Sequence, residues 1–136
     1  MVEVQEAGLE QKHPRLLVDD RFRLEKFDEK FDFIVSVSLF THLPINIIIR
    51  CLSAVQKQLK PDGVYFSSFF QAPKSGCLEK LHHQPGGANT NYDSDPFHYS
   101  FEELLWMASI AGLDMKLIGD WNHPRNQKMA MFYVKQ

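Results

Sequence analysis

Three side chains that can exchange a proton stand just before helix-like segments of this sequence: His42 in "FTHLP", and His98 and Tyr99 in "FHYS". Histidine is the commonest general base near neutral pH, and tyrosine serves less often. Each of the three is a candidate for taking the proton from a hydroxyl group of a small-molecule substrate. A single histidine before a helix also often makes only local hydrogen bonds, so the sequence leaves two interpretations of His42 open.

Metal-ligating residue types also gather between residues 71 and 98, namely Cys77, His82, His83 and His98. Their spacing matches no tight zinc-ligand pattern, so we expect no metal site. The two cysteines, Cys51 and Cys77, do not make a disulfide framework either. Cys51 falls within an apolar helical stretch, where we expect it to behave as a small buried hydrophobe.

Composition narrows the class of protein. The 136 residues are 44% hydrophobic, which suits one globular domain over residues 1–136 with a sizeable core. The net charge of −2 comes without any basic cluster, which argues against a nucleic-acid partner. No apolar run reaches the roughly 18 residues that span a bilayer, and the polar start is unlike a signal peptide. We therefore expect a cytoplasmic protein with a small-molecule substrate.

The elements that must position these residues follow from hydrophobic periodicity. The pattern predicts a short helix over 2–12 and two longer helices, over 43–60 and 101–111. It predicts strands over 15–20, 33–39, 64–70, 114–121 and 128–134. Strands that alternate with helices indicate a parallel sheet, and the last two strands form an antiparallel hairpin.

Local signals mark where these elements begin and end. Thr41 is a plausible N-cap for the first long helix, and "KPDG" at 60–63 ends it. Ser100 and Glu103 form a capping box ahead of the second long helix. The apolar strand over 33–39 is typical of a strand covered on both faces. The loop insert over 71–98 is rich in Pro, Gly, Asn and Asp, and a loop of that length is usually functional or mobile.

In this order the segments resemble the latter part of class I S-adenosylmethionine-dependent methyltransferases. The matching runs are "LLVDD", "FDFIVSVSLFTHLP", "LSAVQKQLKPDGVYFSSFF" and "FHYSFEELLWMASIAGLDMKLIGDW". That family has an aspartate at the end of its third strand, then an "FD" strand, an "HL" turn and an "LKPGG" turn. Here Asp62 replaces the first glycine of that last turn. The resemblance implies a Rossmann-like α/β fold and S-adenosylmethionine as cofactor.

The sequence also departs from the family. The glycine-rich loop that follows the family's first strand is missing, because Gly8 is the only early glycine and Gly86 and Gly87 lie in the wrong place. The family's second strand, which ends in an acidic residue that holds the ribose, is missing too. The sequence therefore looks like a methyltransferase fold truncated at its N-terminus.

Ligands of open α/β sheets bind at the carboxyl ends of the strands. The resemblance places the cofactor there, and we expect two neighbouring parallel strands to end side by side at Asp20 and Ser36. It implies that Asp20 contacts the adenine amino group and that the amino-acid end passes the strand that carries the two serines. The implied cofactor-binding set is Asp20, Arg21, Ser36, Val37, Ser38 and His42.

Simpler interpretations of the same residues remain open. Asp20 can be a solvated loop residue or a helix cap, and Ser36 and Ser38 can bond to nearby backbone within a packed strand. The segment 121–127 can line an acceptor site or simply turn a hairpin.

Two functions compete at this stage. The first is methyl transfer to a small molecule or glycan, with His42 or Tyr99 as the base. The second is a scaffold without a cofactor pocket that acts through self-association, as a homodimer at the exposed edge of the strand over 33–39, or through a partner chain. A nicotinamide-dependent oxidoreductase would need G-x-G-x-x-G after a strand, and the sequence has none.

Overall fold

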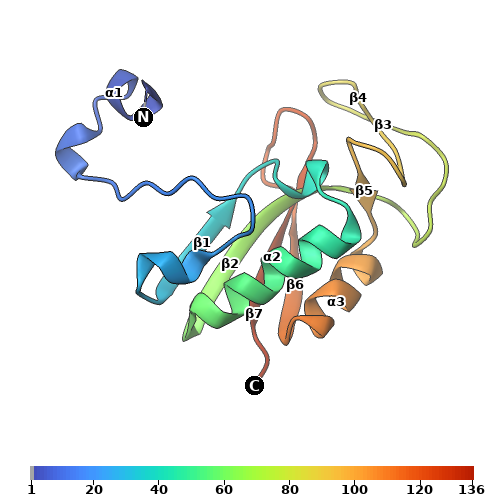
Figure 1. The fold of residues 1–136 in the computed structure, drawn as a ribbon. Helices are drawn as coiled ribbons and strands as arrows, with labels where there is room; N and C mark the ends of the chain where they lie inside the picture. The colour runs from blue at the N-terminus through green and yellow to red at the C-terminus, as the bar shows by residue number, and fades with distance from the viewer. Residues whose placement is uncertain (1) are drawn as a thin grey trace.

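The computed structural model describes residues 2–136, and a mixed β-sheet lies at its centre (Figure 1). Its strands follow the order β1 (Phe31–Ser36), β2 (Leu59–Gln71), β7 (Lys128–Val134) and β6 (Leu113–Gly119), while the short β5 (His98–Tyr99) pairs with the end of β2. β1 and β5 are parallel to β2, whereas β7 is antiparallel to both of its neighbours. The predicted α/β sheet with a C-terminal antiparallel hairpin is confirmed.

Both long helices lie on the same face of this sheet (Figure 1). α2 (Ile45–Gln58) and α3 (Phe101–Ile110) bury apolar stripes against the sheet and each other. Tyr65 and Phe132 face the helices from neighbouring strands and stack with ring centroids 5.6 Å apart, and Phe40 packs edge-on against both. Aromatic burial thus dominates the core on this face. Cys51 is 3% exposed, as predicted, and burial raises the pKa of its thiol to about 11.

The predicted start of α3 is confirmed, whereas the predicted N-cap of α2 is wrong. Ser100 and Glu103 make the full capping box at the start of α3. Thr41 is not an N-cap, because it lies in a 3-10 turn, η3 (Phe40–His42), and its hydroxyl donates to the Ser38 carbonyl. α2 begins after Pro44 instead. The "KPDG" segment belongs to β2, where Gly63 passes so close to the Phe31 carbonyl that a Cβ atom would come within 2.7 Å.

The expectation that the first apolar strand is covered on both faces is wrong. Phe33, Val35 and Val37 are 74%, 67% and 51% exposed, because α2 and α3 cover only the opposite face. Within residues 2–136, β1 also lacks a partner on its outer edge. The structure therefore presents an apolar face beside an open edge of the sheet.

The prediction of a strand over 15–20 is wrong as well. These residues form no sheet pairing, and Val18 is fully exposed. A strand needs a neighbour for its backbone groups, and the described part of the chain offers this segment none. Side chains hold it instead: Arg15 pairs with Glu29, and Asp19 holds the turn that follows. The segment leads back from α1 (Val2–Glu6) and the 3-10 turn η1 (Glu10–Lys12), which bury no side chain.

The insert over 71–98 is ordered around a two-stranded hairpin of β3 (Leu81–His83) and β4 (Ala88–Thr90). Its tip lies against the loop between β6 and β7. Gly86, at φ +94°, makes this contact, and a Cβ there would come within 2.6 Å of the Pro124 carbonyl oxygen and 2.9 Å of the Arg125 Cα. Only glycine fits such an approach. In residues 2–136, no helix is both apolar and long enough to cross a bilayer.

Candidate functional site

The carboxyl end of β1 carries the two serines that the sequence singled out. Ser36 lies opposite Ser67 of β2, and its hydroxyl is 2.9 Å from that of Ser67 and 2.7 Å from the Tyr65 hydroxyl. Since Ser67 and Tyr65 are both buried, this bond satisfies polar groups that would otherwise be costly inside the core. The Ser36 side chain is therefore engaged within the protein.

Ser38 turns the chain after β1. Its φ of +59° is rare for a residue with a side chain, and three bonds hold the turn in place. The Ser38 N–H donates to the Ser68 hydroxyl at 2.8 Å, and the amide of the buried Gln127 donates to the Ser38 hydroxyl at 2.9 Å. Gln127 also accepts from Ser68 at 2.6 Å. Val37, between the serines, stays half exposed at the open edge.

His42 lies directly beyond this turn and forms a pair with Asp95. Its Nδ1 is 2.7 Å from the Asp95 carboxylate, and both side chains are more than half exposed. Asp95 belongs to the insert, which also bonds to η3 through the Phe97 N–H and the Thr41 carbonyl. A carboxylate can only accept, so Nδ1 carries the proton and Nε2 of the neutral ring is left as an acceptor.

The other two predicted bases are buried and engaged. Tyr99 is 1% exposed, its hydroxyl donates to the Leu43 carbonyl, and burial raises the pKa of the phenol well above its usual value. His98 is fully buried, with Nε2 bonded to the Cys77 carbonyl and Nδ1 to the Thr90 hydroxyl. We assign neither residue a catalytic step.

Asp19 and Asp20 face opposite ways. The Asp19 carboxylate accepts from the Arg21 N–H at 2.7 Å and from the Arg23 guanidinium at 2.7 Å, and these bonds lower its pKa strongly. Asp20 and the Arg21 side chain are exposed, with no hydrogen bond to any residue in 2–136. The expected pair of strand ends at Asp20 and Ser36 is not formed, because Asp20 does not end a strand.

The residues that sequence reasoning missed are Asp95 and Gln127. Each forms a hydrogen bond with a residue far away in the chain: Asp95 bonds to His42, and Gln127 bonds to Ser38. A local sequence pattern cannot predict such contacts. Among residues 2–136, no three histidine, cysteine or acidic side chains converge as a metal site would require.

Several solved methyltransferase structures have a fold similar to that of this chain. An S-adenosylmethionine-dependent methyltransferase from Clostridium acetobutylicum matches 99% of this chain with a TM-score of 0.68 and 13% identity. The CcbJ methyltransferase from Streptomyces caelestis matches 88% with a TM-score of 0.61 and 14% identity. The mitomycin 7-O-methyltransferase MmcR matches 98% with a TM-score of 0.70 and 12% identity.

The fold is that of the class I S-adenosylmethionine-dependent methyltransferases. The chain spans 69%, 63% and 38% of the length of the Clostridium protein, CcbJ and MmcR, respectively. No family model matches the sequence, and no curated protein matches it. At these identities the likeness concerns the fold alone.

The polar groups that remain free fit part of this cofactor. The side chains of Asp20 and Arg21 are exposed and form no hydrogen bond to any residue in 2–136, and Val37, just beyond β1, is half exposed. No glycine occurs between Gly8 and Gly63, so within residues 2–136 nothing corresponds to the glycine-rich loop of the family. The described chain thus leaves the Asp20 carboxylate and the Arg21 side chain free to meet a ligand, and it has no counterpart of that loop.

Proposed function

We propose that this chain takes part in S-adenosylmethionine-dependent methyl transfer to a small molecule or glycan. The observation that carries the proposal is the His42–Asp95 pair directly beyond the carboxyl end of β1, in a chain with a methyltransferase fold. Ligands of open α/β sheets bind at that end. Support for the cofactor comes from the Clostridium protein, whose fold this chain shares and whose description names S-adenosylmethionine dependence.

The residues of the proposed site have separate tasks. S-adenosylmethionine brings an electrophilic methyl group on a sulfonium when it is bound. Asp20 accepts from the adenine amino group, and Arg21, Val37 and the backbone of Ser38 border the rest of the molecule. His42 takes the proton that an acceptor hydroxyl loses, because Asp95 holds the proton on Nδ1 and keeps Nε2 free.

Calorimetric titration with S-adenosylhomocysteine tests the cofactor site directly. We expect saturable binding with a Kd of about 100 µM or tighter. Asp20→Asn removes a charged acceptor and should weaken binding about tenfold. Asp28→Asn is the matched control, since Asp28 is also an exposed loop aspartate and should leave the affinity unchanged. Absence of heat at millimolar ligand would rule the cofactor site out.

The exposed face of β1 favours a second candidate function, a scaffold that pairs with a second copy of itself. Phe33, Val35 and Val37 form an apolar row next to a strand edge with unpaired backbone groups, and such edges promote strand addition. Here the role of the chain would be assembly, and the cofactor would be dispensable.

Light scattering over a concentration series tests this candidate. Association should appear as a mass that doubles with concentration, and Val35→Lys should abolish it by placing a charge on the edge. Ile110→Lys, on the exposed side of α3, is the control because it adds the same charge away from β1. A monomer at every concentration contradicts the scaffold function.

A further inference from the structure

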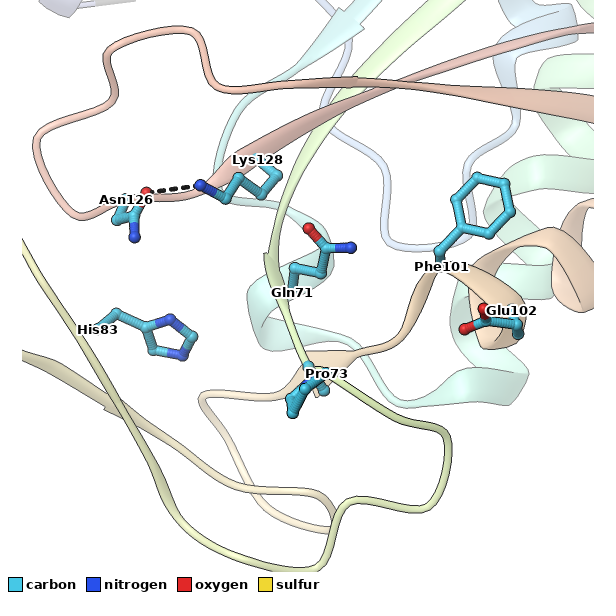
Figure 2. A pocket seen from close by; sticks show the side chains of 8 residues that line it. Gln71, Pro73, His83, Phe101, Glu102, Asn126 and Lys128 are labelled. Atoms are coloured by element: carbon cyan, nitrogen blue, oxygen red, sulfur yellow. Dashed lines mark hydrogen bonds between the residues drawn. The ribbon is translucent and has the colours of Figure 1, made fainter.

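A cavity of about 320 Å³ opens where the carboxyl end of β2 meets the start of β7 and the start of α3. Figure 2 shows its wall, with His83 and Phe101 at opposite ends and Lys128 and Asn126 along one side. Gln71 and Pro73 of the chain that leaves β2 complete it. The cavity therefore lies at the same end of the sheet as His42, but at β2 and β7 rather than at β1.

His83 is held there by a chain of buried hydrogen bonds. Its Nε2 is 2.8 Å from the Thr90 hydroxyl, which is 2.9 Å from Nδ1 of His98. Nε2 of His98 is 2.7 Å from the Cys77 carbonyl. Thr90 and His98 are fully buried, and His83 is 8% exposed and packs on the Phe70 ring at 4.6 Å.

The direction of these bonds follows from the carbonyl, which can only accept. Nε2 of His98 must therefore donate to Cys77, and Nδ1 of the neutral ring accepts from Thr90. The Thr90 oxygen in turn accepts from Nε2–H of His83. That arrangement leaves Nδ1 of His83 without a proton, as a lone-pair acceptor. Burial, together with the positive charge that His98, His82 and Lys128 can carry, lowers the pKa of His83 and favours the same neutral ring.

Nδ1 of His83 makes no hydrogen bond to any residue in 2–136. Among residues 2–136 there is no fully buried side-chain nitrogen or oxygen that lacks a partner. Nδ1 must therefore be reachable from open space, and the space that His83 lines is this cavity. The Gln71 amide, which also makes no bond in the described chain, adds both a donor and an acceptor to the same wall.

The charges on the wall favour an uncharged ligand. The Lys128 ammonium bonds to the Asp120 carboxylate and to the Asn126 side-chain oxygen at 2.9 Å, so its charge is already matched. The Glu102 carboxylate at the other end of the cavity opposes an anion, and the Lys128 ammonium, although paired, still lies on the wall and opposes a cation. Amides, an imidazole acceptor and the apolar Phe101 together suit a molecule with several hydroxyl groups on a carbon ring.

We propose that this cavity binds the methyl acceptor, a neutral polyhydroxylated molecule of the sugar type, and that Nδ1 of His83 accepts a hydrogen bond from one of its hydroxyl groups. The name "methyl acceptor" rests on the proposed function. The binding site itself rests only on the cavity and on the bonds that orient His83. Thr90 and His98 are positioning residues in this scheme, because they act through His83.

Nitrogen NMR of the histidine rings tests the orientation. In the wild-type chain we expect His83 and His98 to show protonated Nε2 and unprotonated Nδ1. Thr90→Val keeps the shape but removes the hydroxyl, and it should convert His83 to a mixture of the two tautomers. A wild-type His83 ring with its proton on Nδ1 overturns the proposal.

Titration with methyl β-D-glucopyranoside, followed by the His83 ring signals, tests the ligand class. We expect saturable shifts with a Kd of about 10 mM or tighter. His83→Gln should weaken binding at least about fivefold, because the glutamine amide can still donate to Thr90 but its flexible side chain does not hold an acceptor at the position that the rigid ring gives Nδ1. His82→Gln is the matched control, since the neighbouring ring is exposed, bonds to Asn89 and does not line the cavity. The methyl-group spectrum of each variant verifies its fold.

Three binding results would overturn the proposal. Equal binding by wild type and His83→Gln, as followed by amide signals, or no saturable shift up to about 200 mM sugar, overturns the proposal. So does tighter binding of methyl β-D-glucuronide, which would make the cavity an anion site. Sugar binding without S-adenosylhomocysteine binding would keep the cavity and remove the methyl-transfer function, and the reverse result would remove only the sugar.

Discussion

His42 and His83 are both held by groups of the insert over 71–98, yet the two histidines are held in opposite ways. His42 is exposed and its partner is the Asp95 carboxylate, whereas His83 is buried and its partner is the Thr90 hydroxyl, which His98 bonds in turn. An exposed hydrogen bond to a charged carboxylate contributes little to stability because water and salt screen it. A buried chain of neutral bonds stabilises the fold, since each broken link leaves an unpaired polar group. The fold thus depends on the second arrangement far more than on the first.

The largest expected effect tests that dependence. His98→Ala leaves the Cys77 carbonyl and the Thr90 hydroxyl without their partner and opens a cavity in the insert, so we expect a loss of about 3 kcal/mol in the free energy of unfolding. His42→Ala should change it by less than about 0.5 kcal/mol. Urea denaturation of the two variants gives both numbers, and equal losses would erase the distinction between the two histidines.

The exposed pair should matter for turnover instead. With an accepted hydroxyl substrate, His42→Gln should lower kcat about a hundredfold, and Asp95→Asn about tenfold because the ring keeps its base but loses its orientation. Release of S-adenosylhomocysteine measures the rate. Calorimetry with the same ligand is the control, since neither change should alter its affinity much. A rate unaffected by both substitutions would assign proton removal to another group.

The smallest expected effect concerns pH. The pKa of His83 is lowered in the folded state by burial and then by His98, His82 and Lys128, so below pH 6.5 the unfolded chain takes up a proton that the folded chain resists. The contribution of the neutral His83 ring to the free energy of unfolding is therefore complete above pH 6.5. It falls as the pH drops toward the lowered pKa of the folded state, by at most about 1.4 kcal/mol per pH unit.

Urea midpoints of wild type and His83→Gln between about pH 5 and 7.5 isolate this contribution. The variant should show a shallower decline. His123, whose pKa is also lowered by burial, is present in both proteins and cancels in the difference. Identical slopes would mean that His83 titrates normally in the folded chain.

Several local signals predicted the structure correctly, although the signals for Thr41 as an N-cap and for a turn over 60–63 did not. The stripe of α2, the capping box of α3 and the final hairpin each follow from residues a few positions apart, and the order of these elements implies the sheet. The strand over 15–20 has an equally good local pattern, and it failed because a strand exists only through a neighbour. The covered face expected for β1 failed for the same reason, since cover comes from other elements.

The candidate site depended still more on distant residues. Which of Asp19 and Asp20 turns inward is decided by the bonds to Arg21 and Arg23, not by the acidic pattern itself. The partners of His42 and Ser38 come from elsewhere in the chain, and the His83 network joins four segments of the insert. The hydroxyl groups of Ser36 and Ser38 bond to side chains of β2 and to Gln127, and not to nearby backbone as the simpler interpretation of the sequence supposed.

Gly86 fixes the distance between the tip of the insert and the loop before β7, because no side chain fits between them. The β3–β4 hairpin, which carries His83, and the loop that leads to Lys128 therefore contact each other at this one point. Adding a residue to either the hairpin or the loop would break this contact and displace His83 and Lys128 together. A change in what the cavity can hold must therefore be made by exchanging side chains at constant loop length.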